Sequence, residues 1–433
     1  MPSSDLRAPI RLLGRAPDLR LLLGAGLVSM TGDWLLSVGL AYSVYALTGS
    51  TLASAAALLS AFVPQVLVGS IAGVFVDRWD RTRTMVVTNL LLAVGLLPLL
   101  RVSGADRIWL VYVVLAVQSC IEVFFSPAEQ AFLPRIVGDA DLVAANGLNS
   151  QIRNLARLVG SGLGGVIAAT GGIRAIAIAD AVTFVVAALL ITRIRTAGRA
   201  LLESPSTAAD EEAADVVRGR VAGLVEEWKV GLRTVTASPV LRTLMLMLLI
   251  TSTGEGIMGT LFAPYVRHVL HGTGQEYGVI TGVQAIGGVV GGFLVAVVAE
   301  RWSPVAMVWA GSIAFGLVDL AIFLYPLLWV TPWPAAAGMI VVGLPGAVMI
   351  AGVMTLYQRH TTDDRRGRVF SLVSLAQAIS VVVGSSVAGF FGGPTGIMPI
   401  LALQGAGYVV AGLLVLTRLG VREGSLDLSP TRS

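Results

Sequence analysis

The sequence predicts an all-α integral membrane protein whose twelve membrane-spanning helices form two six-helix bundles around a central cavity. Composition is the first reason: 55% of the 433 residues are hydrophobic and 13% are charged, whereas soluble domains average about 25% charged residues. Long apolar runs and an internal repeat are the other two reasons. A membrane β-barrel is excluded because no segment alternates polar with apolar residues.

The individual helices follow from the apolar runs, because a bilayer core requires about 20 apolar residues per helix. The first six predicted spans are 21–46, 53–76, 84–100, 108–131, 147–170 and 175–192. The second six are 243–266, 276–299, 304–329, 334–357, 369–391 and 397–417. The predicted domains are therefore an N-terminal half (1–192), a cytoplasmic linker (193–242) and a C-terminal half with a cytoplasmic tail (243–433).

The linker differs in composition from the two halves. It begins with polar and acidic residues and continues with an apolar series at helical spacing, Val221, Leu224, Trp228 and Leu232. This spacing indicates an amphipathic helix that lies at the membrane interface. A helix that binds a partner protein is the alternative.

The basic residues predict the orientation of the spans. With the N-terminus inside, only Arg101, Arg107, Arg174 and Arg267 fall in segments outside the cytoplasm. Because cytoplasmic loops carry the excess of Lys and Arg, both termini are expected in the cytoplasm. The same bias explains the net charge of +4 without nucleic acid. The first twenty residues end in no cleavage-type site, so we interpret them as a cytoplasmic tail and not as a signal peptide.

The two halves of the chain share three short motifs in the same order. "TGD" at 31–33 recurs as "TGE" at 253–255, "GVFVDRWDR" at 73–81 as "AVVAERWSP" at 296–304, and "GSGLGG" at 160–165 as "GSSVAG" at 384–389. The offsets are almost constant, at 222 to 224 residues. Six spans per half make the repeat parallel. Such repeats, packed around a cavity at the membrane midplane, are typical of secondary transporters.

Several motifs resemble those of the major facilitator superfamily. "GVFVDRWDRTR" (73–83) is similar to its G-x-x-x-D-R-x-G-R-[RK] loop between spans two and three. Similarity to its macrolide-efflux and enterobactin-exporter branch lies in "SPAEQAFLPRIV" (126–137), "LVAANGLNS" (142–150), "RNLARLVGSGLGG" (153–165) and "RRGRVFSL" (365–372). The resemblance covers nearly the whole chain and implies the major facilitator fold. Two positions depart from it: Asp80 replaces the usual loop glycine, and Ser161 stands where this branch often has proline.

Acidic residues inside the spans are the candidate functional groups. Asp33 lies about 18 Å into span one, near the midplane, and Glu255 lies at the matching depth in span seven. An acid there costs about 2.5–3.5 kcal/mol on insertion scales, so it should face a cavity or a partner. The resemblance implies that spans one, four, seven and ten line the cavity, which adds Glu122 of span four.

Burial disfavours the charged form of a carboxyl group, so such an acid could take up a proton on one side of the membrane and release it on the other. We therefore expect Asp33, Glu255 and Glu122 to serve proton coupling or substrate binding. The alternative is structural: acids that pair with arginine or accept backbone hydrogen bonds.

Two arginines lie within span five. Arg153 and Arg157 are four residues apart on one helical face, with Asp180 of span six and Glu129 at the end of span four as possible partners. We predict an ion-pair network among these four residues, with binding of an anionic substrate as the alternative.

The loop after span two is too polar to form a substrate site in the central cavity. The resemblance implies that it is a cytoplasmic gating latch whose acid meets the positive N-terminal end of a helix in the other half, for which span eleven is the best candidate. Its residues are Gly73, Asp77, Arg78, Arg81 and Arg83. A short positive-inside turn is the alternative.

Several functional classes are disfavoured. Cys120 is the single cysteine, so no internal disulfide is possible, and one Cys with three His disfavours a metal site. No G-x-x-x-x-G-K-[ST] loop is present, which excludes an ATP-driven pump. Nothing resembles a nucleophile–base arrangement, so no enzyme and no cofactor are expected.

The predicted function is secondary active transport. We expect a proton-coupled antiporter in a bacterial inner membrane that exports an amphipathic small molecule, such as a drug, an antibiotic or a siderophore, by alternating access. A monomer with protons, substrate and lipid as its only partners is expected. Alternatives are a lysolipid flippase, a proton-coupled importer and, last, a membrane receptor or assembly partner.

Overall fold

The computed structural model describes residues 8–76, 79–138, 141–196, 229–393 and 396–420. These residues are almost entirely helical and contain no β-strand. Among them, eleven helices are long and apolar enough to cross a membrane. The predicted class, an all-α multi-pass membrane protein, is therefore confirmed, while the exact number of spans remains a prediction.

Contacts between residues group the chain into two compact units. The first comprises residues 1–202 with 272–285, and the second comprises 203–271 with 286–433. The first contains α1 (Ala8–Arg15), α2 (Pro17–Thr48), α3 (Thr51–Val76), α4 (Arg81–Gly95), α5 (Trp109–Glu122), α6 (Phe125–Val137) and α7 (Leu142–Thr192). The second contains α9 (Pro239–Pro264), α11 (Pro304–Leu324), α12 (Trp333–Arg359), α13 (Asp363–Phe391) and α14 (Ile397–Val415). The division runs through α10 (Gly274–Val298).

Short 3₁₀ or π-helical turns lie next to the ends of several of these helices. They are the 3₁₀ turns η1 (Leu97–Arg101), η2 (Ala105–Arg107) and η5 (Tyr325–Leu327), and the π turns η4 (Tyr265–Val269) and η6 (Leu416–Gly420).

Local sequence fixes where the helices begin. Both α9 and α11 start with a serine N-cap followed by proline at the first helical position. The Ser238 hydroxyl accepts a hydrogen bond from the Leu241 amide at 3.4 Å, and the Ser303 hydroxyl accepts one from the Ala306 amide at 3.1 Å. Proline loses no intrahelical hydrogen bond at this position, and its fixed φ angle suits the first turn.

Helix α7 contains a break at Gly172. Its 51 residues would extend about 77 Å as one straight helix, far more than the roughly 30 Å hydrocarbon core. Gly172 has φ 61° and ψ −162°, a conformation available essentially to glycine alone. It lies between the predicted spans 147–170 and 175–192. The predicted span 108–131 is also interrupted, because α5 ends at Glu122 and α6 begins at Phe125.

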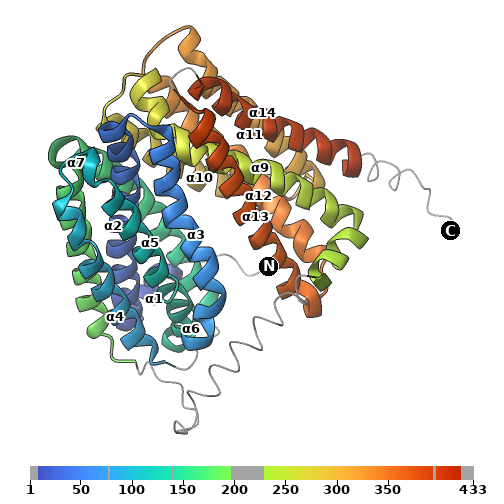
Figure 1. Ribbon diagram of the computed structural model, residues 1–433. Coiled ribbons are helices and arrows are strands. Elements are labelled where there is room, and N and C mark those ends of the chain that lie inside the picture. Colours follow the sequence, from blue (N-terminus) through green and yellow to red (C-terminus); the bar gives the residue numbers. More distant parts are fainter. Residues whose placement is uncertain (1–7, 77–78, 139–140, 197–228, 394–395, 421–433) are drawn as a thin grey trace. The chain divides into compact units, whose positions relative to one another are not determined.

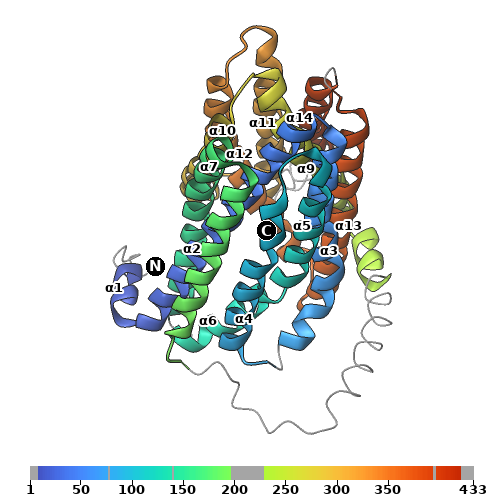
Figure 2. The ribbon, with the colours of Figure 1, turned by 60° about the vertical axis from the view of Figure 1, so that its left-hand side comes forward.

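Glycines bring α2 and α7 into backbone contact in the first unit, where the two helices lie side by side (Figure 1). A Cβ atom on Gly160 would lie 2.4 Å from the Thr31 carbonyl oxygen, and one on Gly164 would lie 2.6 Å from that of Leu35. In the second unit, α11 packs against α12 and α14, and α9 packs against α13 and α14 (Figure 2).

Part of the linker packs on the second unit. Residues 229–237 are helical, with Val235 buried in an apolar cluster that includes Val369 and Val373 of α13. Leu232 points outward and is 54% exposed, which leaves it available to a membrane interface. The other residues of the predicted amphipathic face, Val221, Leu224 and Trp228, lie outside the described residues.

Candidate functional site

Three carboxylates gather within the first unit, carried by α2, α5 and α7. Asp33 is half-buried, Glu122 is exposed and Asp180 is fully buried. Asp33 lies close enough to Glu122 and Asp180 for their charges to interact. Among the described residues, the Asp33 carboxylate has neither a hydrogen bond nor an ion pair. Neighbouring carboxylates repel one another when both are ionised.

Asp180 owes its position to a glycine. A Cβ atom on Gly32 would lie 2.1 Å from the Asp180 Oδ1 atom and 2.0 Å from the Thr183 hydroxyl, so only glycine lets α7 approach next to Asp33. The Thr183 hydroxyl donates to Asp180 Oδ1 at 3.0 Å. The Oδ2 atom is buried without a hydrogen-bond partner in the described part of the chain.

A second acidic site lies within the second unit. The Tyr408 hydroxyl of α14 donates a hydrogen bond to Glu255 of α9. One turn away, Gln404 Nε2 donates to Asp319 Oδ2 of α11 at 2.7 Å. Asp319 is 2% exposed, and Glu255 is exposed. The charges of Glu255 and Asp319 lie within interaction range of each other.

The two sites correspond through the internal repeat. Gly254 precedes Glu255 as Gly32 precedes Asp33, and a Cβ atom on Gly254 would lie 2.8 Å from Gln404 Cγ. Gln404 follows Asp180 by 224 residues, the offset of the repeat in these spans. In each unit, the glycine that precedes Asp33 or Glu255 therefore packs against a polar residue of the last long helix.

The four residues of the predicted ion-pair network separate into distinct contacts. Arg153 Nη2 lies 3.7 Å from Glu129 Oε2, whose side chain is 3% exposed. Arg157 instead hydrogen-bonds Gln284 and lies over the Trp34 ring, 4.8 Å from its centre. Asp180 pairs with neither arginine, because it faces Gly32 and bonds Thr183.

Within the predicted gating loop, Asp77 and Arg78 lie outside the described residues. Gly73 belongs to α3, while Arg81 and Arg83 lie in the first turn of α4, half-buried and exposed respectively. The departure at position 80 has a structural reason: Asp80 is the N-cap of α4, and its Oδ1 accepts from the Arg83 amide at 2.8 Å.

Sequence reasoning left Asp319 without a role and did not single out Tyr408 or Gln404. The 224-residue offset of the repeat, applied to Asp180, points to Gln404. Gln404 in turn hydrogen-bonds Asp319. No group of three or more His, Cys, Asp or Glu residues suited to a metal ion occurs within the described ranges.

The long apolar helices define the class of the protein as a multi-pass membrane protein. The sequence model of the transmembrane secretion effector family matches residues 13–432. The chain belongs to this family of major facilitator transporters, which confirms the resemblance noted from its motifs.

Relatives support the same assignment. The chain is 30% identical over 376 residues to the multidrug efflux pump Tap of Mycolicibacterium fortuitum, covering 83% of this chain and 86% of that one. It is 21% identical to macrolide efflux protein A of Streptococcus pyogenes, over 87% of this chain and 90% of that protein. The fold is similar to that of a bacterial homologue of the iron transporter ferroportin, with TM-score 0.74 and 14% identity over 93% and 98% of the two chains.

Proposed function

We propose that this protein is a proton-coupled exporter of an amphipathic small molecule in a bacterial inner membrane. Twelve spans, formed by dividing α7 at Gly172, would make two six-helix halves (1–192 and 243–433) joined by the linker 193–242. Both termini would be cytoplasmic, and the monomer would work by alternating access. The observation that carries this proposal is the unpaired Asp33 carboxylate, held near midplane depth beside Glu122 and Asp180.

The export direction and the substrate class draw support from the relatives, two of which are named as efflux proteins. An amphipathic molecule is the substrate class that fits cavity walls formed by largely apolar helices bearing a few acids. A cationic group on the substrate would be attracted by the same carboxylates. Substrate and proton would then compete for one negatively charged site, which is the simplest coupling scheme for an antiporter.

In this scheme, Asp33 is the primary coupling acid. Asp33 is half-buried and Glu122 is exposed, whereas lipid contact would be costly for either group. Both should therefore face water or protein. Uptake of a proton on the outer side would neutralise Asp33 and expel a cationic substrate, and release of that proton to the cytoplasm would restore the site.

In the second half, we assign Glu255 the corresponding role in proton coupling or substrate binding, with Asp319 as its neighbouring acid. The hydrogen bond from Tyr408 to Glu255 and that from Gln404 to Asp319 hold both acids in place. The ion pair of Arg153 with Glu129 is assigned a structural role in the first half. The loop from Gly73 to Arg83 is assigned the gating latch.

Export from cells lacking their own pumps tests the proposal. Accumulation of macrolides, other antibiotics and siderophores would be measured with and without a protonophore, for the wild type, Asp33→Asn and Asp106→Asn. Asp106 is a matched control because it is an exposed acid in η2. The wild type and the control should lower accumulation of at least one compound until the protonophore is added.

The Asp33→Asn variant should lose at least tenfold of this export at normal membrane levels. Full export by this variant would remove Asp33 from the coupling role. Export that persists in the presence of the protonophore would refute proton coupling itself.

A further inference from the structure

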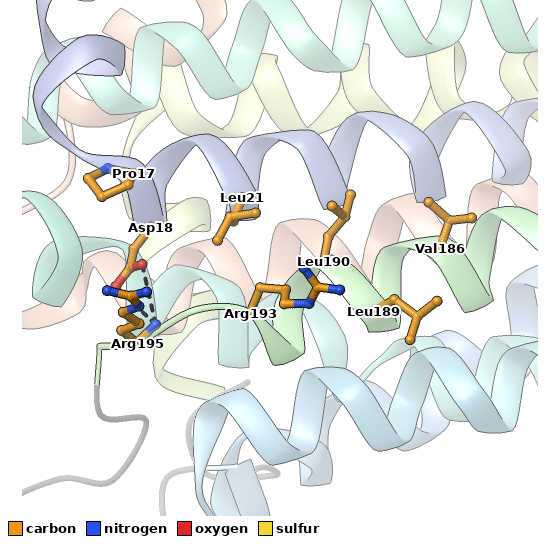
Figure 3. Close-up of a pocket in the computed structure, with 8 residues that line it drawn as sticks. All are labelled: Pro17, Asp18, Leu21, Val186, Leu189, Leu190, Arg193 and Arg195. Carbon is orange, nitrogen blue, oxygen red and sulfur yellow. Dashed lines mark hydrogen bonds between the residues drawn. The ribbon is translucent and has the colours of Figure 1, made fainter.

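A cavity of about 580 Å³ lies between the first turn of α2 and the last turns of α7, away from the acidic sites. Figure 3 shows its two kinds of wall. Asp18 and Arg195 form a polar end, Arg193 extends beside Leu190, and Leu21, Val186 and Leu189 are among the apolar lining residues. A charged end joined to an apolar wall at the border of a membrane helix matches the shape of a lipid molecule.

The Asp18 carboxylate is occupied by hydrogen bonds from the chain that follows α7. Its Oδ2 atom accepts from the Thr196 amide at 2.8 Å and from the Thr196 hydroxyl at 2.6 Å, and the Arg195 amide donates to the carboxylate at 3.2 Å. It also lies in the first turn of α2, where the helix dipole stabilises an anion. The carboxylate thus ties the start of α2 to the chain after α7.

The two arginines supply the positive charge of this region: the charge of Arg195 interacts with that of Asp18, whereas Arg193 extends away from Asp18 (Figure 3). Both side chains are exposed, and within the described ranges neither forms an ion pair. Figure 3 shows Arg193 extended beside Leu190 and Arg195 beside Asp18. Guanidinium groups bind phosphate oxygens in a two-pronged arrangement. With Asp18 included, the polar end has a net charge of about +1, which favours an anionic headgroup.

The apolar wall has the length of an acyl chain. Leu189 is 59% exposed and Val182 is 55% exposed. A second cavity of about 300 Å³, lined only by apolar side chains, shares Val186 with the first and continues toward η1. The eleven residues from Val182 to Thr192 extend about 16 Å along α7, close to half of the roughly 30 Å hydrocarbon core.

We propose that this groove, defined by Asp18, Arg193, Arg195, Val186 and Leu189, binds an anionic phospholipid. Its phosphate contacts the two guanidinium groups, and one acyl chain lies along the outward face of α7. The bound lipid would brace the junction of α2 and α7, the helices that carry Asp33 and Asp180. This inference does not depend on the substrate or on proton coupling.

Native mass spectrometry of the full-length, delipidated protein in detergent tests the proposal. Binding of phosphatidylglycerol and of phosphatidylethanolamine would be titrated for the wild type, Arg193→Gln/Arg195→Gln and Arg233→Gln/Arg242→Gln. The last pair is a matched control because both arginines are exposed and line neither cavity. At about 1 kcal/mol per arginine, the first double variant should bind phosphatidylglycerol about 30-fold more weakly, and the control should bind it like the wild type.

Leu189→Gln provides an independent test, because its exposed side chain contributes little to internal packing. It should weaken phosphatidylglycerol binding severalfold and leave the thermal unfolding temperature unchanged. Equal binding of phosphatidylglycerol by the wild type and by Arg193→Gln/Arg195→Gln would overturn the proposal. Equal affinity of the wild type for the two lipids would overturn its anionic selectivity.

Discussion

Replacing Gly164 by alanine tests the close contact between α2 and α7. The added methyl carbon would lie 2.6 Å from the Leu35 carbonyl oxygen and 3.0 Å from its Cα atom, whereas carbon atoms in good contact are about 3.5–4.0 Å apart. Because both neighbours are backbone atoms, no side-chain rotation relieves the clash. The two helices must therefore separate locally, two residues after Asp33.

Gly162→Ala is the matched control, since a Cβ atom on Gly162 would meet nothing within 4 Å. Both substitutions gain the same helix propensity, about 0.8–1.0 kcal/mol, so the difference between them isolates the clash. Overpacking of this kind costs about 1–3 kcal/mol. We expect Gly164→Ala to be less stable than Gly162→Ala by this amount.

Unfolding of the purified variants by sodium dodecyl sulfate in mixed micelles, followed by circular dichroism, measures the difference in free energy of unfolding. Export by the same variants in cells reports whether displacing α2 near Asp33 also impairs transport. Equal stability of the two variants, within about 0.5 kcal/mol, would refute the inferred backbone contact.

Three further predictions concern other parts of the fold. Gly172→Ala should lower the free energy of unfolding by about 1–3 kcal/mol, because alanine rarely adopts the backbone angles found there. Unchanged stability in the same detergent titration would mean that the break in α7 has another conformation. Asp80→Ala should lower the free energy of unfolding by about 1 kcal/mol because it removes the N-cap of α4, whereas Asp80→Gly should lower it by only a few tenths. Similar losses of thermal stability in the two variants would argue against capping by Asp80. Tyr408→Phe removes only the donor to Glu255 and should cost about 1.5–3 kcal/mol at a pH where Glu255 is ionised, so a variant as stable as the wild type would show that this hydrogen bond contributes nothing.

Hydropathy and the repeat predicted most of the helical organisation, because span length and apolarity are imposed by the bilayer. The backbone breaks were less predictable. The gap between the predicted spans 147–170 and 175–192 contains Gly172, whose positive φ angle depends on how the two segments of α7 pack. The interruption after Glu122 has a proline signal that the predicted span 108–131 did not take into account. Pro127 lacks an amide hydrogen and cannot donate to the carbonyl of Val123, the residue that follows the end of α5.

The candidate site was predictable in part. Asp33 and Glu255 stood out because an acid inside an apolar span is costly, whatever the packing. Whether an arginine pairs with an acid depends instead on the rotation of its helix about the axis. Gly32 leaves space for Asp180 against α2, while Arg157 hydrogen-bonds Gln284 and lies over the Trp34 ring. Spacing along the sequence does not contain this information.

Proton movement in liposomes measures the central claim most directly. Purified wild type, Asp33→Asn and Asp106→Asn would be reconstituted with a pH-sensitive dye inside, and a compound that the wild type exports from cells would be added. Substrate addition should drive proton movement through the wild type and Asp106→Asn but not through Asp33→Asn, because a neutral asparagine can neither carry the proton nor attract a cationic substrate. Proton movement through Asp33→Asn at the rate of the wild type would contradict the assignment of Asp33 as the coupling acid.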